Sequence, residues 1–137
     1  LFLLQLARHR RIRWIFTHGA GTLPLLVDRL DMFRRLFGSA DAADPTVHEQ
    51  LGELWFDMAG TPFPHQIPAY ARVFALERLL YGSDFCWTPA PVAAAQVAAI
   101  DGAEQPVGES WRGLTTRNAR RLFGRLEATV VDAQSCH

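Results

Sequence analysis

Apolar residues along the chain fall into short runs that alternate with turns and with amphipathic segments. Residues 12–17 (IRWIFT) are rich in β-branched and aromatic side chains, which predicts a short buried strand, and the glycine turn HGAGT follows. A helix is expected from Leu23 until Gly38, because apolar side chains recur there every three or four positions. These side chains share one face: Leu26, Leu30, Phe33 and Phe37. The pattern predicts a strand, a loop and a helix in that order.

The same order repeats twice further along the chain. Residues 54–59 (LWFDMA) and 78–83 (RLLYGS) predict a second and a third strand, each followed by a loop with glycine or proline and then by a helix. Three strand–helix units in succession imply parallel strands with right-handed crossovers. The other expected segments are the end of a helix over 1–8, an irregular stretch over 39–52, and helices near 67–74, 92–100 and 116–126.

Three parallel strands do not form a comfortable sheet by themselves. Strands this apolar need both faces covered and both edges paired. We therefore expect an α/β fold in which the chain supplies about three units of a TIM (β/α)8 barrel. Functional residues of that fold lie at the carboxyl ends of the strands. Three segments occupy those places, namely His18 with its glycine turn, residues 57–61 and residues 84–87.

Composition agrees with one globular domain and argues against several functional classes. The 137 residues are 49% hydrophobic, and 14 basic side chains, all arginine, balance 14 acidic ones. The zero net charge disfavours a nucleic-acid partner, so the arginine-rich residues 8–13 and 117–125 are expected to be solvated ends of elements. No membrane span or signal peptide is evident, and we expect a cytoplasmic protein without a membrane partner. The chain begins on apolar residues at Leu1, as a piece of a longer protein would.

Four segments together resemble one known family. IFTHGAGTLPLLVDRL, LWFDMAGTPFP, RLLYGSDFCWTP and NARRLF are similar to the sixth, seventh and eighth strand regions and the closing helix of the amidohydrolase-related family. That family holds metal-dependent hydrolases together with aminocarboxymuconate semialdehyde and resorcylate-type decarboxylases. The resemblance covers residues 8–124. It implies that residues 1–126 form the C-terminal part of the barrel and that residues 127–137 form a tail.

The resemblance also implies roles for two residues. Asp84 matches the aspartate that serves as metal ligand and proton carrier, and His18 matches the histidine that orients the metal-bound water or the substrate. A divalent ion, with zinc as the default and manganese as the alternative, would lower the pKa of bound water. Phe85 and Trp87 either line a substrate pocket or pack under the loop. Asp57 could line the pocket, although pairing with a barrel arginine is the favoured interpretation.

The rest of the family's site is absent from the sequence. A zinc site needs about three protein ligands, and no His-x-His pair occurs here. Two positions depart from the family pattern, because Ala20 stands where a third glycine is common and Cys86 where a proline is common. The two cysteines, Cys86 and Cys136, have no metal-binding spacing, and Cys86 is expected to be a small buried apolar residue.

Three functional hypotheses follow. The first is a metal-dependent enzyme that hydrolyses or non-oxidatively decarboxylates a small carboxylated or cyclic molecule, with a homo-oligomer as one expected assembly. The second is a catalytically incomplete remnant that associates through its sheet edges, and a weaker third is an arginine-mediated nucleic-acid binder. If the barrel assignment holds, His18 and Asp84 lie at one end of the sheet. Strand alternation then predicts that both point inward, His18 on the face of Trp14 and Phe16, and Asp84 on that of Leu80 and Gly82.

Overall fold

The computed structural model describes residues 8–9, 11–38 and 44–124. Within them a three-stranded parallel sheet has the order β1-β2-β3, which is also the order along the chain. The strands are β1 (Ile15–Phe16), β2 (Trp55–Asp57) and β3 (Leu79–Leu80). The helices are α2 (Leu23–Phe37), α3 (Val47–Gly52), α4 (Ile67–Ala71), α5 (Ala90–Gly102) and α6 (Trp111–Leu122). Short helical turns cover His18–Ala20, Pro62–Gln66 and Leu76–Arg78.

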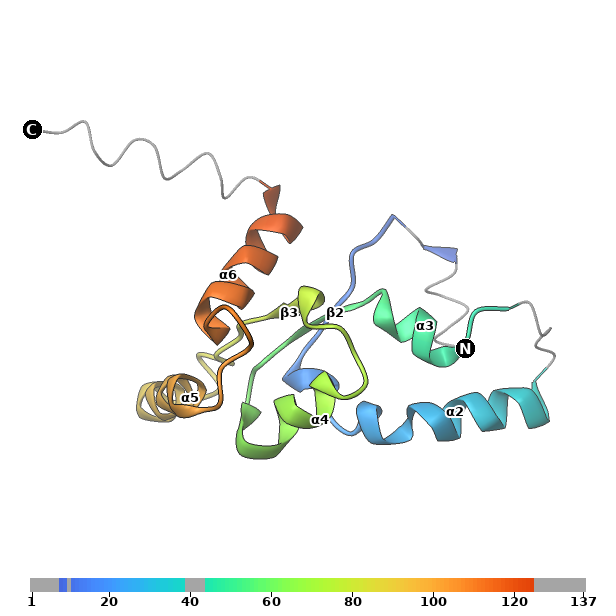
Figure 1. The fold of residues 1–137 in the computed structure, drawn as a ribbon, viewed down its shortest axis with the longest axis horizontal. Helices are drawn as coiled ribbons and strands as arrows, with labels where there is room; N and C mark the ends of the chain where they lie inside the picture. The colour runs from blue at the N-terminus through green and yellow to red at the C-terminus, as the bar shows by residue number, and fades with distance from the viewer. Residues whose placement is uncertain (1–7, 10, 39–43, 125–137) are drawn as a thin grey trace, which may run out of the picture.

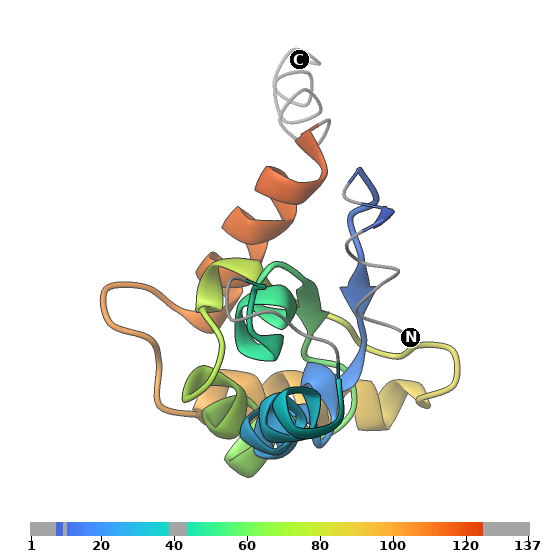
Figure 2. The same cartoon turned by 90° about the vertical axis from the view of Figure 1, so that its right-hand side faces the viewer.

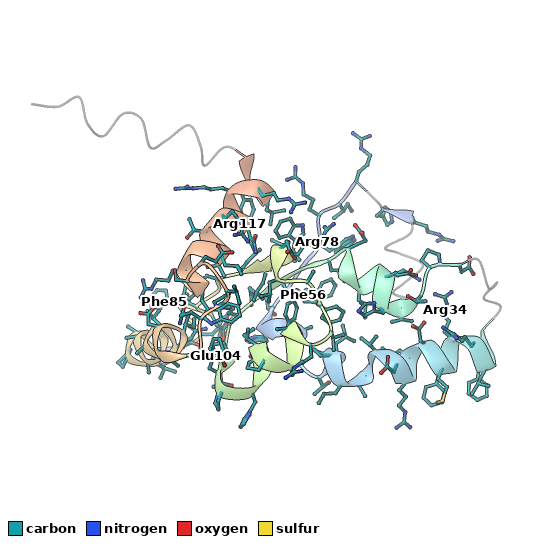
Figure 3. All side chains as sticks on the ribbon, in the orientation of Figure 1. Arg34, Phe56, Arg78, Phe85, Glu104 and Arg117 are labelled. Carbon is teal, nitrogen blue, oxygen red and sulfur yellow. The ribbon has the colours of Figure 1, made fainter. Side chains whose placement is uncertain are left out.

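One face of the sheet carries the main core. Phe16 lies opposite Phe56 and Phe56 opposite Leu79, so these three side chains form a row on the same face. Tyr70 and Phe74 from the α4 region pack on Phe56, with ring centroids 5.4 Å from it. Figure 3 shows Phe56 in the middle of the molecule, between the strands and these helices. Helices thus cover this face, as they cover the outside of a (β/α)8 barrel.

The opposite face of the sheet carries a smaller cluster. Trp55 and Leu80 pack there against Leu122 of α6. Asp57 lies opposite Leu80 in the parallel register, which puts its side chain on this same face. Because Phe16 packs with Phe56 on the other face, the expectation that Phe16 and Leu80 both face inward was wrong.

The physical reason is a turn at the end of β1. The backbone of His18 has φ of 57°, in the left-handed region, so the two-residue alternation of a strand stops before it. The direction of the His18 side chain therefore cannot be extrapolated from Phe16.

Two helices differ from the expectation. The stretch 39–52 was expected to be irregular, but α3 occupies Val47–Gly52 and starts with a capping box, in which Thr46 and Glu49 cap each other's backbone N–H groups. These hydrogen bonds from Thr46 hold the pKa of Glu49 below its usual value. Helix α6 begins at Trp111, five residues before the expected start, because the Ser110 hydroxyl accepts a hydrogen bond from the Gly113 amide at 3.1 Å.

The helices also define the two ends of the molecule. Figures 1 and 2 show α2, α4 and α5 gathered toward the end where the strands finish, with α6 toward the other. Asn118 fixes α6 to β3, since its amide donates to the carbonyls of Leu76 at 2.7 Å and Leu79 at 2.8 Å. No helix in the described part of the chain is long and apolar enough to cross a membrane. The expected boundary at residue 126 and the tail 127–137 lie outside the described residues.

Candidate active site

The three strands end at the same edge of the sheet, and each is followed by backbone in the left-handed region. His18 and Ala20 follow β1 with φ of 57° and 66°, Gly60 follows β2 with 85°, and Asp84 follows β3 with 57°. Because the strands are parallel, their carboxyl ends place His18 and Asp84 at one end of the sheet. The expectation that these two residues lie at the same end was correct.

Side chains from other elements hold the backbone of His18. Its amide donates to Oδ1 of Asp57 at 2.9 Å, and its carbonyl accepts a hydrogen bond from the side-chain amide of Gln66. The imidazole lies over Gly60, where a Cβ atom would be only 3.1 Å from Nδ1 of the ring. Gly60 thus leaves room for the ring, and the His18 side chain itself is exposed.

Asp57 lies between the ends of the other two strands. Its Oδ1 accepts hydrogen bonds from the backbone amides of His18 and Ala59, both at 2.9 Å. The expected pairing with an arginine is not seen within residues 8–9, 11–38 and 44–124, where Asp57 accepts hydrogen bonds from backbone amides. The carboxylate therefore organises the strand ends by hydrogen bonding.

Asp84 occupies the turn after β3. Its Oδ2 accepts a hydrogen bond from the Thr88 hydroxyl at 3.2 Å, and its carbonyl accepts one from the Thr88 amide at 2.8 Å. These bonds are those of a turn residue. Because the turn uses only Oδ2 of the carboxylate, Oδ1 can serve as a metal ligand without breaking the turn.

The residues after Asp84 are open to solvent. Phe85 is 70% exposed and Trp87 is 89% exposed, so neither packs under the loop. Figure 3 shows Phe85 beside α5, away from the central Phe56. Cys86 is an exposed free thiol, and the expectation of a buried cysteine was wrong. The loop around Cys86 is exposed, so it offers no buried place for this small side chain.

Sequence reasoning missed two glutamines that support this edge. Gln96 of α5 is buried, and its side-chain amide donates to the carbonyls of Met58 at 2.8 Å and Gly82 at 2.9 Å. It thereby ties the ends of β2 and β3 together, much as Gln66 ties the turn after β1. The available signal for Gln96 was a polar side chain in the middle of an alanine-rich helix.

The donor set for a metal is incomplete in the described part of the chain. No group of three or more histidine, cysteine, aspartate or glutamate side chains converges there. A catalytic zinc site uses three protein ligands. The carboxylate of Asp84 fits one such ligand, and the described residues alone do not fit a complete site.

A comparison with protein-family models identifies the family. The amidohydrolase model matches residues 5–125, which is most of the chain. The chain belongs to the amidohydrolase family. Members of this family are metal-dependent enzymes. A search of curated proteins found no match.

Solved structures similar to the chain have the same fold. An amidohydrolase II superposes with a TM-score of 0.73 at 23% identity, over 88% of this chain and 38% of its own. The apo form of an IDCase from Metarhizium anisopliae has a TM-score of 0.70 at 24% identity. The match covers 92% of this chain and 37% of the IDCase chain. A 5-carboxyvanillate decarboxylase from Sphingomonas paucimobilis has a TM-score of 0.66 at 18% identity. The match covers 88% of this chain and 36% of the decarboxylase chain. The chain therefore spans less than two fifths of each of these three proteins and has the fold of part of a TIM barrel.

Proposed function

We propose that the chain contributes the C-terminal part of the active site of a metal-dependent hydrolase or carboxy-lyase. The substrate would be a small carboxylated or cyclic molecule. Two observations support a carboxylated substrate: similar solved structures include the 5-carboxyvanillate decarboxylase and a 2,6-dihydroxybenzoate decarboxylase in complex with 2,6-dihydroxybenzoate. Another is a 4-oxalomesaconate hydratase, which supports the broader class of enzymes acting on small acids.

The observation that carries the proposal is the placement of His18 and Asp84 at one end of the parallel sheet. In a (β/α)8 barrel this end is where substrate binds. The carboxylate of Asp84 would accept and return a proton at the reacting centre, in keeping with general acid–base chemistry. The exposed imidazole of His18 would orient the reacting oxygen of the substrate or water. Phe85 and Trp87 would cover the bound substrate.

A divalent ion would be held by Asp84 together with ligands from outside the described residues. When bound, it would supply Lewis-acid chemistry, which acidifies water or polarises a carboxyl group. Zinc is the default, and manganese is supported by its presence in a dihydroxybenzoic acid decarboxylase from Polaromonas. We further propose a cytoplasmic enzyme that forms a homo-oligomer and has no nucleic-acid or membrane partner.

A specific observation favours the alternative of a self-associating, catalytically incomplete module. Helix α2 exposes a set of large apolar side chains: Leu25, Leu26, Leu30, Met32, Phe33, Leu36 and Phe37. An apolar face of this kind associates with other surfaces in water. Metal content and turnover distinguish this alternative from an enzyme.

Two substitutions in the intact protein test the proposed roles. Asp84→Asn keeps the size of the side chain but removes its charge, so metal content should fall and turnover should drop by about 100-fold or more. His18→Ala should leave metal content near the wild-type level while turnover collapses, because it removes an orienting group and no proposed ligand. Metal analysis and steady-state kinetics measure both.

Each alternative outcome has a definite meaning. If His18→Ala loses metal as readily as Asp84→Asn, His18 is a ligand. If Asp84→Asn keeps both metal and turnover, the proposed site is wrong.

A further inference from the structure

We propose that Asp57 is the positioning residue of this site: it holds His18 in its working conformation and sets the approach of the strand end that carries Asp84. The inference rests on the proposed function, because positioning His18 affects catalysis only if His18 acts on the substrate. It is carried by contacts of Asp57 with the ends of both neighbouring strands.

The first contact is with the backbone of His18. The left-handed conformation at His18, with φ of 57°, is uncommon for a residue with a side chain and must be stabilised by its surroundings. The hydrogen bond from its amide to Asp57 Oδ1 at 2.9 Å has a charged acceptor, which makes such bonds stronger than neutral ones. Gln66 binds the carbonyl of the same residue. Both polar groups of the His18 backbone are therefore held by side chains distant in sequence.

The second contact is with Gly82, two residues before Asp84. A Cβ atom built on Gly82 would lie 2.8 Å from Cγ of Asp57 and 2.9 Å from its Oδ2. These separations are too short for real atoms, so the carboxylate fills the space that a side chain at position 82 would take. The end of β3 can approach β2 this closely only because residue 82 is glycine.

Two substitutions of Asp57 distinguish a role that needs its hydrogen bonds from one that needs its negative charge. Asp57 Oδ1 accepts from two amides, those of His18 and Ala59, and the amide oxygen of asparagine can accept the same bonds. Asp57→Asn should therefore preserve the arrangement, whereas Asp57→Ala removes both bonds. A role as proton carrier or metal ligand for Asp57 would give the opposite result, because asparagine would abolish it.

Hydrogen exchange of the intact protein, followed by peptide mass spectrometry, tests the contact itself. Asp57→Ala should speed exchange of the His18 and Ala59 amides at least 10-fold, and Asp57→Asn should keep most of the protection. Asp31→Ala is the matched control, since Asp31 accepts a hydrogen bond from the Val47 amide at 2.8 Å in the same way. It should speed exchange near Val47 only. Unchanged exchange at His18 in Asp57→Ala would overturn the proposal.

A second pair of variants tests the contact with β3 and does not depend on the folding of Asp57→Ala. Gly82→Ala keeps Asp57 but adds a methyl group where its carboxylate lies, so exchange at His18 should speed up in this variant as well. Gly102→Ala is the control, because nothing lies within 4 Å of a Cβ atom built there. Equal exchange at His18 in these two variants would contradict the role of Asp57 as the link between the strand ends.

Kinetics test the consequence for catalysis. Asp57→Ala should lower kcat by about 100-fold with little change in KM, which is the order of loss caused by misplacing a reacting group by about 1 Å. Asp57→Asn should restore kcat to within about 10-fold of the wild type, and Asp31→Ala should leave it unchanged. If His18→Ala keeps full turnover, the proposed function fails. If His18→Ala loses turnover while Asp57→Ala keeps it, the positioning role alone fails.

Discussion

At the scale of single residues, Tyr70 shows how burial in this core controls an ionisation. Its ring packs against both Phe56 and Phe74, and its hydroxyl donates to the carbonyl of Ala75 at 3.2 Å. Burial raises the pKa of Tyr70 well above its usual value, because the phenolate would lose its hydration. Tyr70 therefore stays neutral in the folded chain at a pH where it ionises in the unfolded chain.

This shift predicts weaker folding at alkaline pH. A group whose folded pKa is raised contributes stability that is present below its unfolded pKa, about 10 for tyrosine, and is lost as pH rises beyond it. The free energy of unfolding should fall by ~1 kcal/mol between pH 10 and 11 from this residue. Urea unfolding at several pH values measures the loss. The Tyr70→Phe variant should lack this pH-dependent loss of stability. If its free energy of unfolding falls equally steeply between about pH 10 and 11, other groups cause the loss.

Residues of the site differ in how far the sequence predicts them. The positions of His18 and Asp84 at one end of the sheet follow from short strands in a repeated order, and the structure agrees. The partners Gln66 and Gln96 could not be found, because they bind backbone carbonyls that are distant in sequence and no local pattern marks such bonds. The role of Asp57 as a backbone acceptor was hidden for the same reason.

At the scale of elements, the order of strands and helices was predictable while their lengths were not. Strand β1 has two residues, although six were expected, and the turn at His18 sets its carboxyl end. Helix α3 was missed even though Thr46 and Glu49 stand at the spacing of a capping box. Residues 39–52 were expected to be irregular because most of their side chains are small or polar.

Helix α6 offers a prediction at this scale, because Asn118 is its buried attachment to β3. Asn118→Leu leaves the carbonyls of Leu76 and Leu79 without their donors in a site where Asn118 is 1% exposed. An unsatisfied buried polar group costs about 1–3 kcal/mol, so the variant should lose at least ~2 kcal/mol of stability. Denaturant unfolding measures this loss. Thr116→Leu, at an exposed position of the same helix, is the control and should change stability by less than ~0.5 kcal/mol; equal effects would contradict the anchoring role.

At the scale of the whole molecule, the sequence predicted a parallel sheet belonging to part of a (β/α)8 barrel, and both the sheet and the similar solved structures agree. The exposed apolar face of α2 fits a surface that packs against other structure. The two faces of the sheet could not be assigned from alternation alone. The turn at His18 breaks that alternation at the residue of greatest interest.

The most direct test of the proposed site is a crystal structure of the intact protein grown with zinc or manganese, with the metal located by its anomalous scattering. We predict a metal peak at coordinating distance from the Asp84 carboxylate, at the end of the sheet where β1, β2 and β3 finish. His18 should lie beside it without binding it, with its amide still bonded to Asp57. A metal bound elsewhere, with Asp84 making only its turn contacts to Thr88, would contradict the account.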